Sequence, residues 1–139
     1  MMQTENNMKV ELAYYEITEY LRIHNNQELG FTYVSPSTIN VQTDVKVTFV
    51  KTHIDANITL EKIVGNDLYL SYSIPPVLNW VVNHVRSLLR IKYPMIDVDE
   101  DNLVVHLDKI SQLQKVMQTI ELQSVDFSQD NVNLGINLK

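Results

Sequence analysis

The hydrophobic positions near the start of the chain follow a helical period. Apolar residues recur at steps of three and four from Val10 to Leu21, as on a helix that buries one face. The pattern predicts an N-terminal helix at about residues 9–24. A strand remains an alternative for its first half, because a second, two-residue alternation runs through Met8, Val10, Leu12 and Tyr14. The following stretch, FTYVSPS at 31–37, is expected to be a connection.

From Ser37 the period falls to two, which is typical of strands with one apolar and one polar face. Three such runs occur, at residues 37–49, 53–64 and 68–74. The sequence Gly65-Asn66-Asp67 between the second and third runs is favourable for a tight turn. These features predict a three-stranded antiparallel meander with one apolar face.

The next stretch, residues 75–93, is the most apolar in the chain. As a helix of about residues 75–92, it would gather its clearest polar side chains in one narrow wedge and leave the rest of its surface apolar. Pro75 and Pro76 suit the start of a helix, and Pro94 suits its end. Such a helix should be enveloped, so we expect the sheet to cover it or curl around it.

Further strands and a short helix are predicted after Pro94. Alternation from Leu103 to Asp108 indicates a strand, residues 111–119 a short helix, and the chain closes with a hairpin whose turn lies at 128–131. The predicted fold class is α+β, with a largely antiparallel sheet of about six strands around the helix at 75–92. The chain shows no linker or repeat, so one domain is expected over 1–139, with residues 1–7 disordered.

Composition excludes several classes of function. The formal net charge is −6, with 17 acidic and 11 basic residues, which argues against nucleic-acid binding. The absence of cysteine excludes disulfides, zinc–thiolate sites and thiol nucleophiles. Neither a signal peptide nor a transmembrane run is recognisable, so the expected location is cytoplasmic.

An acidic stretch gives the most specific local signal for a metal. With Asp97 as the first position, Asp99, Asp101 and Asp108 take the third, fifth and twelfth places, where a calcium loop of the EF-hand kind has oxygen ligands. The last ligand would be aspartate rather than the usual glutamate, and strand-like alternation already runs through the same residues. A solvated turn before a strand is the simpler interpretation, so no metal or other cofactor is predicted.

Other polar residues provide no catalytic set. The four histidines (His24, His53, His84 and His106) lack metal-ligand spacing, and a packing or surface role is expected for each. Arg86, Arg90 and Lys92 form a basic cluster that could hold a phosphate or lipid headgroup, or simply face solvent. The prediction is therefore a protein that is not an enzyme.

Long amphipathic strands around a very apolar helix, over roughly Ser37 to Lys139, resemble one half of the tubular lipid-binding (TULIP) superfamily. The closing strand–turn–strand, IELQSVDFSQDNVNLGINLK, is similar to the end of small bacterial proteins of that kind. The resemblance implies an apolar cleft between sheet and helix, lined by Trp80, Val81, Val85, Leu88 and Phe49. The alternative is that these side chains only pack the core.

Three classes of function follow, of which the third is an enzyme whose site is assembled from distant histidines and carboxylates. The first is a non-enzymatic domain that binds a lipid-like apolar ligand or a protein partner. The alternative is a structural or assembly protein whose edge strands pair with another copy or subunit. A homo-oligomer is expected, because a tube built from one half would need a second half and because an assembly role predicts a stable oligomer.

Overall fold

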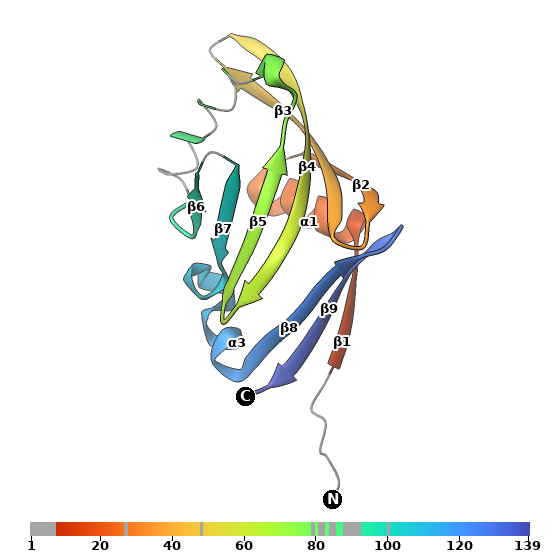
Figure 1. Cartoon of the computed structure of the whole chain (residues 1–139), viewed down its shortest axis with the longest axis vertical. Coiled ribbons are helices and arrows are strands. Elements are labelled where there is room, and N and C mark those ends of the chain that lie inside the picture. Colours follow the sequence, from red (N-terminus) through yellow and green to blue (C-terminus); the bar gives the residue numbers. More distant parts are fainter. Residues whose placement is uncertain are drawn as a thin grey trace, which may run out of the picture.

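The computed structural model describes residues 8–26, 28–47, 49–78, 80, 83, 86–87, 93–99 and 101–139. In this part of the chain two antiparallel sheets dominate, and helices are few and short (Figure 1). The longest described helix is α1 (Tyr14–Asn25), with 12 residues. The predicted α+β fold around a long apolar helix is therefore wrong, since the described residues form a mostly β structure that contains no such helix.

The larger sheet has six strands in the order β2-β3-β4-β5-β7-β6, every neighbouring pair antiparallel. Its strands are β2 (Leu29–Ser35), β3 (Thr38–Val47), β4 (Val50–Val64), β5 (Asp67–Ser73), β6 (Ile96–Val98) and β7 (Asn102–His106). The predicted meander is confirmed as β3-β4-β5. Its second turn places Gly65 at a φ of 61°, a backbone conformation that glycine adopts without steric cost.

The stretch predicted to be a connection is instead the edge strand β2. Gly30 and Pro36 made it look like a loop, but the residues between them alternate. Phe31 lies opposite Val41 and Tyr33 opposite Ile39, so β2 extends the apolar face of β3. Cross-strand packing thus outweighs the two turn-forming residues.

The smaller sheet has the order β1-β9-β8 and joins the two ends of the described chain. It consists of β1 (Met8–Ala13), β8 (Ile120–Phe127) and β9 (Asn131–Leu138), so the predicted C-terminal hairpin is confirmed. The strand alternative is correct for the first residues, and the helix begins at Tyr14 rather than at residue 9. The reason is non-local: Met8, Val10 and Leu12 lie opposite Ile136, Leu134 and Val132 of β9.

The segment predicted as the central helix begins differently. Its described start is a 3-10 turn, η1 (Pro76–Leu78), and Trp80 keeps 53% of its surface exposed. Residues 81–82, 84–85 and 88–92 lie outside the described part of the chain. Among the described residues the most deeply buried apolar side chains come from other elements: Tyr14, Ile39, Ile54, Met117 and Ile136. Hydrophobicity alone does not show whether an apolar segment is buried in a core, and Trp80 of this segment is half exposed.

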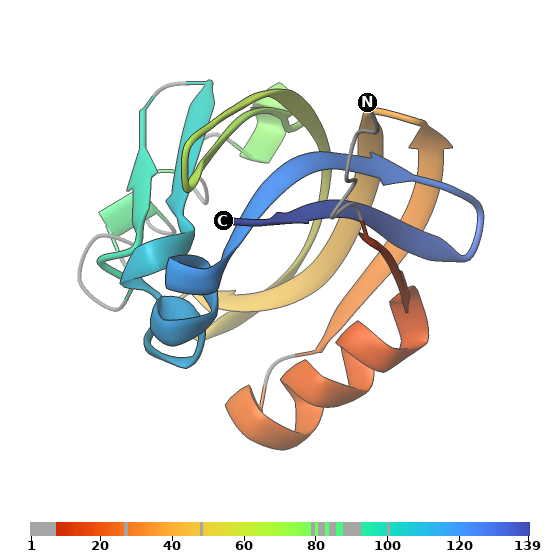
Figure 2. The ribbon, with the colours of Figure 1, turned by 90° about the horizontal axis from the view of Figure 1, so that it is seen from below.

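Short helical turns connect the two sheets. η2 (Leu107–Lys109), η3 (Ser111–Leu113) and α3 (Gln114–Thr119) lead from β7 to β8, close to the predicted short helix, and Met117 of α3 is buried. The six-stranded sheet is a strongly curved band, with α1 on its outer side (Figure 2). The backbone N–H of Phe127 in β8 donates to Pro36 O at 2.9 Å, which fixes the hairpin β8–β9 to the turn after β2.

Candidate functional site

The inner face of the six-stranded sheet contains an apolar cavity of about 180 Å³. Period-two alternation places it there, because alternate residues of β3, β4 and β5 point to the same side. We call it the sheet cavity, and its lining residues are Thr43, Val45, Ile54, Ala56, Ile58, Tyr72, Ile74, Arg86, Val98 and Leu103. Ile54 is buried and packs against Val45 and Leu78, so η1 covers part of this face.

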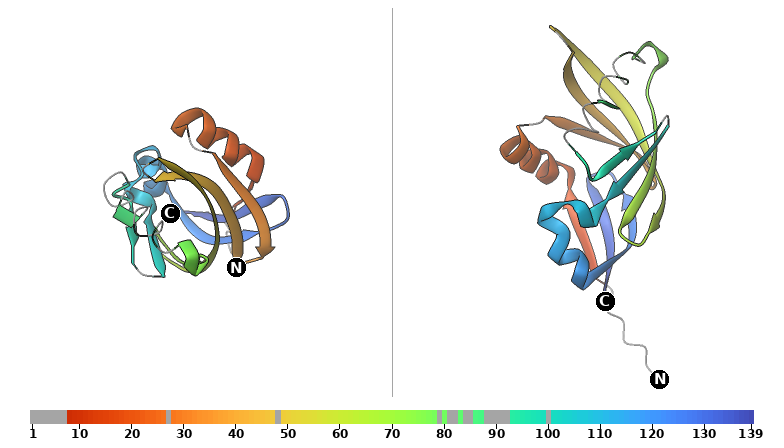
Figure 3. Two further views of the ribbon diagram at one scale, coloured as in Figure 1. Left: turned by 90° about the horizontal axis from the view of Figure 1, so that it is seen from above. Right: turned by 90° about the vertical axis from the view of Figure 1, so that its left-hand side faces the viewer.

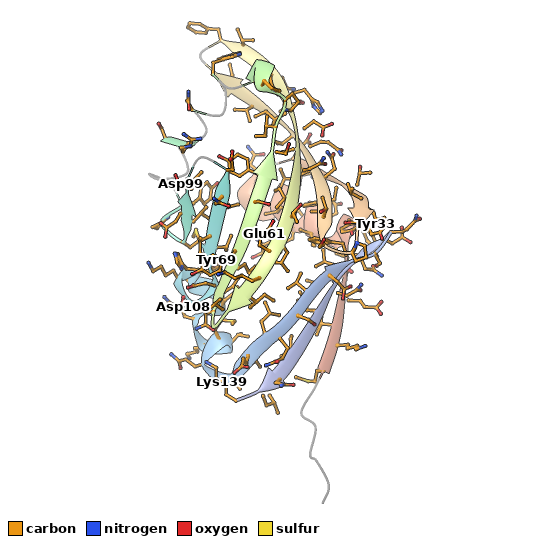
Figure 4. The ribbon with its side chains drawn as sticks, in the orientation of Figure 1. Tyr33, Glu61, Tyr69, Asp99, Asp108 and Lys139 are labelled. Carbon is orange, nitrogen blue, oxygen red and sulfur yellow. The ribbon has the colours of Figure 1, made fainter. Side chains whose placement is uncertain are left out.

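One edge of the sheet cavity carries two polar side chains, although the surface of the hollow itself is almost entirely apolar. Nη2 of Arg86 donates to the hydroxyl oxygen of Tyr72 at 3.4 Å, and that hydroxyl donates to the backbone oxygen of Asp99 at 3.0 Å. Figure 4 shows Asp99 close to the end of β6. Nη1 of Arg86 lies 3.5 Å from Oδ1 of Asn83. A guanidinium and a phenol hydroxyl thus stand side by side at the border of an apolar site, bonded to each other.

The structure places the predicted ligand-binding residues elsewhere or leaves them undescribed. Phe49 is 94% exposed and Trp80 is 53% exposed, and neither lines the sheet cavity. Val81, Val85 and Leu88 lie outside the described residues.

The residues that do line the sheet cavity had left a signal in the sequence. Val45, Ile54, Ala56, Ile58 and Ile74 belong to the apolar faces already visible in the alternation. The alternation identifies the face, but it does not show whether that face is filled or hollow. Of the basic cluster, Arg86 reaches the cavity, while Arg90 and Lys92 are outside the described residues.

Three of the four aspartates considered for calcium lie along a β-hairpin rather than in a loop between two helices, and the fourth lies just after it. Asp97 is in β6, Asp99 and Asp101 flank the turn, and Asp108 is in η2. The turn is closed by a bond from the backbone N–H of Asp99 to Asn102 O at 2.8 Å. Within the described ranges, no group of three or more histidine, aspartate or glutamate side chains is placed to hold a metal ion.

One of these aspartates instead binds a histidine. Nε2 of His106 lies 2.7 Å from Oδ2 of Asp97, and Nδ1 lies 2.7 Å from Oδ1 of Asp67. An ionised carboxylate only accepts hydrogen bonds, and neutral imidazole has a single N–H, so both contacts are satisfied by the protonated ring. The two carboxylates raise the pKa of His106, and the bond to His106 lowers the pKa of Asp97. The trio joins β5, β7 and β6 and serves as a structural tie.

Two larger hollows have a different character. One, of about 380 Å³, lies on the polar face of the three-stranded sheet, and includes Lys9, Glu11 and Asp126. The other, of about 570 Å³, lies between the end of α1 and strands β3 and β4, and includes Arg22, Asp44 and His53. Both are lined largely by polar or charged residues, which leaves the sheet cavity as the apolar site among the three.

No protein-family model matches the chain, and comparison with curated proteins and with solved structures finds no significant match. The resemblance to the tubular lipid-binding superfamily therefore stays a prediction. Among the helices in the described residues, none has the length and apolar character needed to span a membrane. The cytoplasmic location also stays a prediction.

Proposed function

We propose that this chain is a non-enzymatic binding domain that holds an apolar, lipid-like group in the sheet cavity. The observation that carries the proposal is the lining itself, in which apolar side chains of β3, β4, β6 and β7 border a half-open hollow of about 180 Å³. An apolar hollow of this kind loses van der Waals contacts when empty, and an apolar ligand restores them.

The cavity volume limits the size of the ligand. An engineered cavity of about 150 Å³ in another protein accepts benzene, whereas pockets for drug-sized molecules usually exceed about 300 Å³. The sheet cavity, which is half open, is therefore matched to one ring or to part of one acyl chain. A complete two-chain lipid would be too large for it.

The polar edge suggests the chemistry of the ligand head. Arginine binds a carboxylate through two parallel hydrogen bonds, and Tyr72 stands within 3.4 Å of the same guanidinium. A medium-chain carboxylate would place its alkyl chain among Val45, Ile54 and Ile58 and its head at Arg86.

The test compares decanoate with decanol, which share an alkyl chain and differ in charge. Isothermal titration should detect both ligands, with decanoate bound more tightly. Arg86→Gln should weaken the binding of decanoate by about tenfold or more, because hydrogen bonds to charged groups contribute about 1.5–3 kcal/mol. The same variant should leave the binding of decanol nearly unchanged. Ala56→Leu, which fills the cavity, should weaken both. Unchanged binding of both ligands to Ala56→Leu would contradict the proposal.

A second candidate function, assembly through a sheet edge, has one specific observation in its favour. β1 lies at the edge of the three-stranded sheet. On its apolar face, Met8 is 45% exposed and Leu12 is 37% exposed. A second copy could cover that face. Sedimentation analysis of the chain without ligand distinguishes the two roles, since assembly requires a stable oligomer and ligand binding does not.

A further inference from the structure

The hairpin formed by β3 and β4 projects at one end of the molecule (Figures 1 and 3). Beyond the last cross-strand pair, Val47 and Val50, its described end exposes large apolar side chains. Phe49 is 94% exposed and Val50 is 56% exposed. We call Lys46, Phe49, Val50 and Lys51 the hairpin tip.

Such exposure is unfavourable in water, because burying a side chain of this size is worth about 1.5–3 kcal/mol. The same end of the molecule contains η1, just before Trp80, which is 53% exposed. Aromatic side chains of this kind are enriched where proteins meet the headgroup region of a bilayer.

The charges of the hairpin tip point to the sign of the partner. Lys46 and Lys51 lie directly opposite each other on β3 and β4, and like charges in this position destabilise a sheet. Lys51 Nζ is 3.7 Å from Asp44 Oδ2, while among the described residues no carboxylate lies within ion-pair distance of Lys46. The chain as a whole has a net charge of −6, so two neighbouring lysines are a local departure from its acidic character. Near anionic lipid each lysine would gain about 1 kcal/mol.

We infer that the hairpin tip docks on an anionic lipid surface, with Phe49 and Val50 inserted between headgroups and the two lysines at the level of the phosphates. The geometry also relates this surface to the sheet cavity, because Val45 lines the cavity and is two residues before the end of β3. Docking does not require an occupied cavity, so the inference stands apart from the proposed function.

The test uses the full chain and vesicles of phosphatidylcholine with or without phosphatidylglycerol. Co-sedimentation should show binding to the mixed vesicles, and the emission of Trp80, the single tryptophan, should shift to the blue. Val50→Ser should weaken binding about tenfold. Val64→Ser is the matched control, since Val64 lies at the other end of β4 and is 52% exposed.

A second pair of variants tests the charges. Lys46→Glu should reduce binding to the mixed vesicles, whereas Lys115→Glu, at an exposed position of α3, should change it little. Phe49→Ser should abolish detectable binding without changing the urea midpoint, because the ring is almost fully exposed.

Three results would overturn the inference. Equal losses in Val50→Ser and Val64→Ser would show that the hairpin tip has no special role. Equal binding to neutral and anionic vesicles would remove the role of the lysines. No vesicle binding, together with an oligomer that Phe49→Ser dissociates, would assign the hairpin tip to a second copy of the chain instead.

Discussion

His106 illustrates how the neighbours of a single residue set its charge. The ring belongs to β7, Asp67 to β5 and Asp97 to β6. One nitrogen of the ring lies 2.7 Å from a carboxylate oxygen of Asp67, and the other lies 2.7 Å from one of Asp97. Lys109, one turn further along the chain, also favours the ionised form of Asp97. The sequence displays these residues far apart, so only the strand pairing brings them together.

This trio predicts a pH dependence of stability. The pKa of His106 is raised above its ordinary 6.5 in the folded protein, so its contribution is complete below that pH and is lost as the pH rises through the folded value. The pKa of Asp97 is lowered from 3.8, so its contribution is lost as the pH falls through its folded value. The free energy of unfolding, measured with urea at a series of pH values, should decline on the alkaline side. His106→Gln should remove this decline. An unaltered alkaline decline in the variant would contradict the role of His106.

At the scale of elements, Tyr14 fixes the junction between β1 and α1. Its backbone N–H donates to Asp130 O at 3.0 Å and its hydroxyl donates to Ser128 O at 2.6 Å, both in the turn of the hairpin β8–β9. The ring stacks on Phe31 of β2 with centroids 5.8 Å apart. Burial raises the pKa of this tyrosine. The first residue of the helix therefore joins three elements.

Two variants of Tyr14 should separate the contribution of its hydroxyl to stability from that of its ring. Tyr14→Phe should lower the free energy of unfolding by about 0.5–1.5 kcal/mol, the usual worth of one hydrogen bond, while Tyr14→Ala should cost about 3–5 kcal/mol. Tyr15→Phe is the control, because Tyr15 is 73% exposed. Urea unfolding monitored by circular dichroism measures all three. Equal effects of Tyr14→Phe and Tyr15→Phe would show that the bond to Ser128 contributes nothing.

Local pattern predicted some elements and failed at others for identifiable reasons. β3, β4 and β5 alternate over most of their length, so these strands could be predicted, whereas the register shift after Leu60 in β4 could not. β2 was missed because Gly30 and Pro36 suggested a loop, although its pairing with β3 is what makes it a strand. The segment 75–92 was predicted as a core helix because it is apolar on most sides. Whether such a segment fills a core depends on how far the sheet curves around it, which no local period reveals.

At the scale of the whole molecule, the curved six-stranded sheet forms a half-open apolar hollow among the described residues. The sheet cavity lies on the most apolar face of the larger sheet, and Ile54 is its most buried lining residue. The sequence predicted this face but not its hollow, because a volume depends on the distance between elements. A ligand can fill a hollow of this kind, and its binding then stabilises the folded state.

Filling the cavity should therefore stabilise the protein and impair binding together. Ala56→Leu should raise the free energy of unfolding by about 2 kcal/mol, since it adds three carbons and each buried methylene contributes about 0.8 kcal/mol. The same variant should show a smaller rise of the melting temperature with decanoate than the original chain does. A loss of stability in Ala56→Leu, as overpacking produces, would show that the hollow cannot accept added volume.

The order of the three-stranded sheet has a consequence for biosynthesis. β9 is its middle strand and pairs with both β1 and β8. β1 therefore emerges from the ribosome long before β9 has been synthesised. Met8 and Leu12 stay unpaired while the strands of the six-stranded sheet are made. Pairing across such a sequence separation is slow because the loop must close first. The nascent chain thus exposes the apolar residues of β1 until β9 has been made, and this interval is when a holding chaperone would be of most use to it.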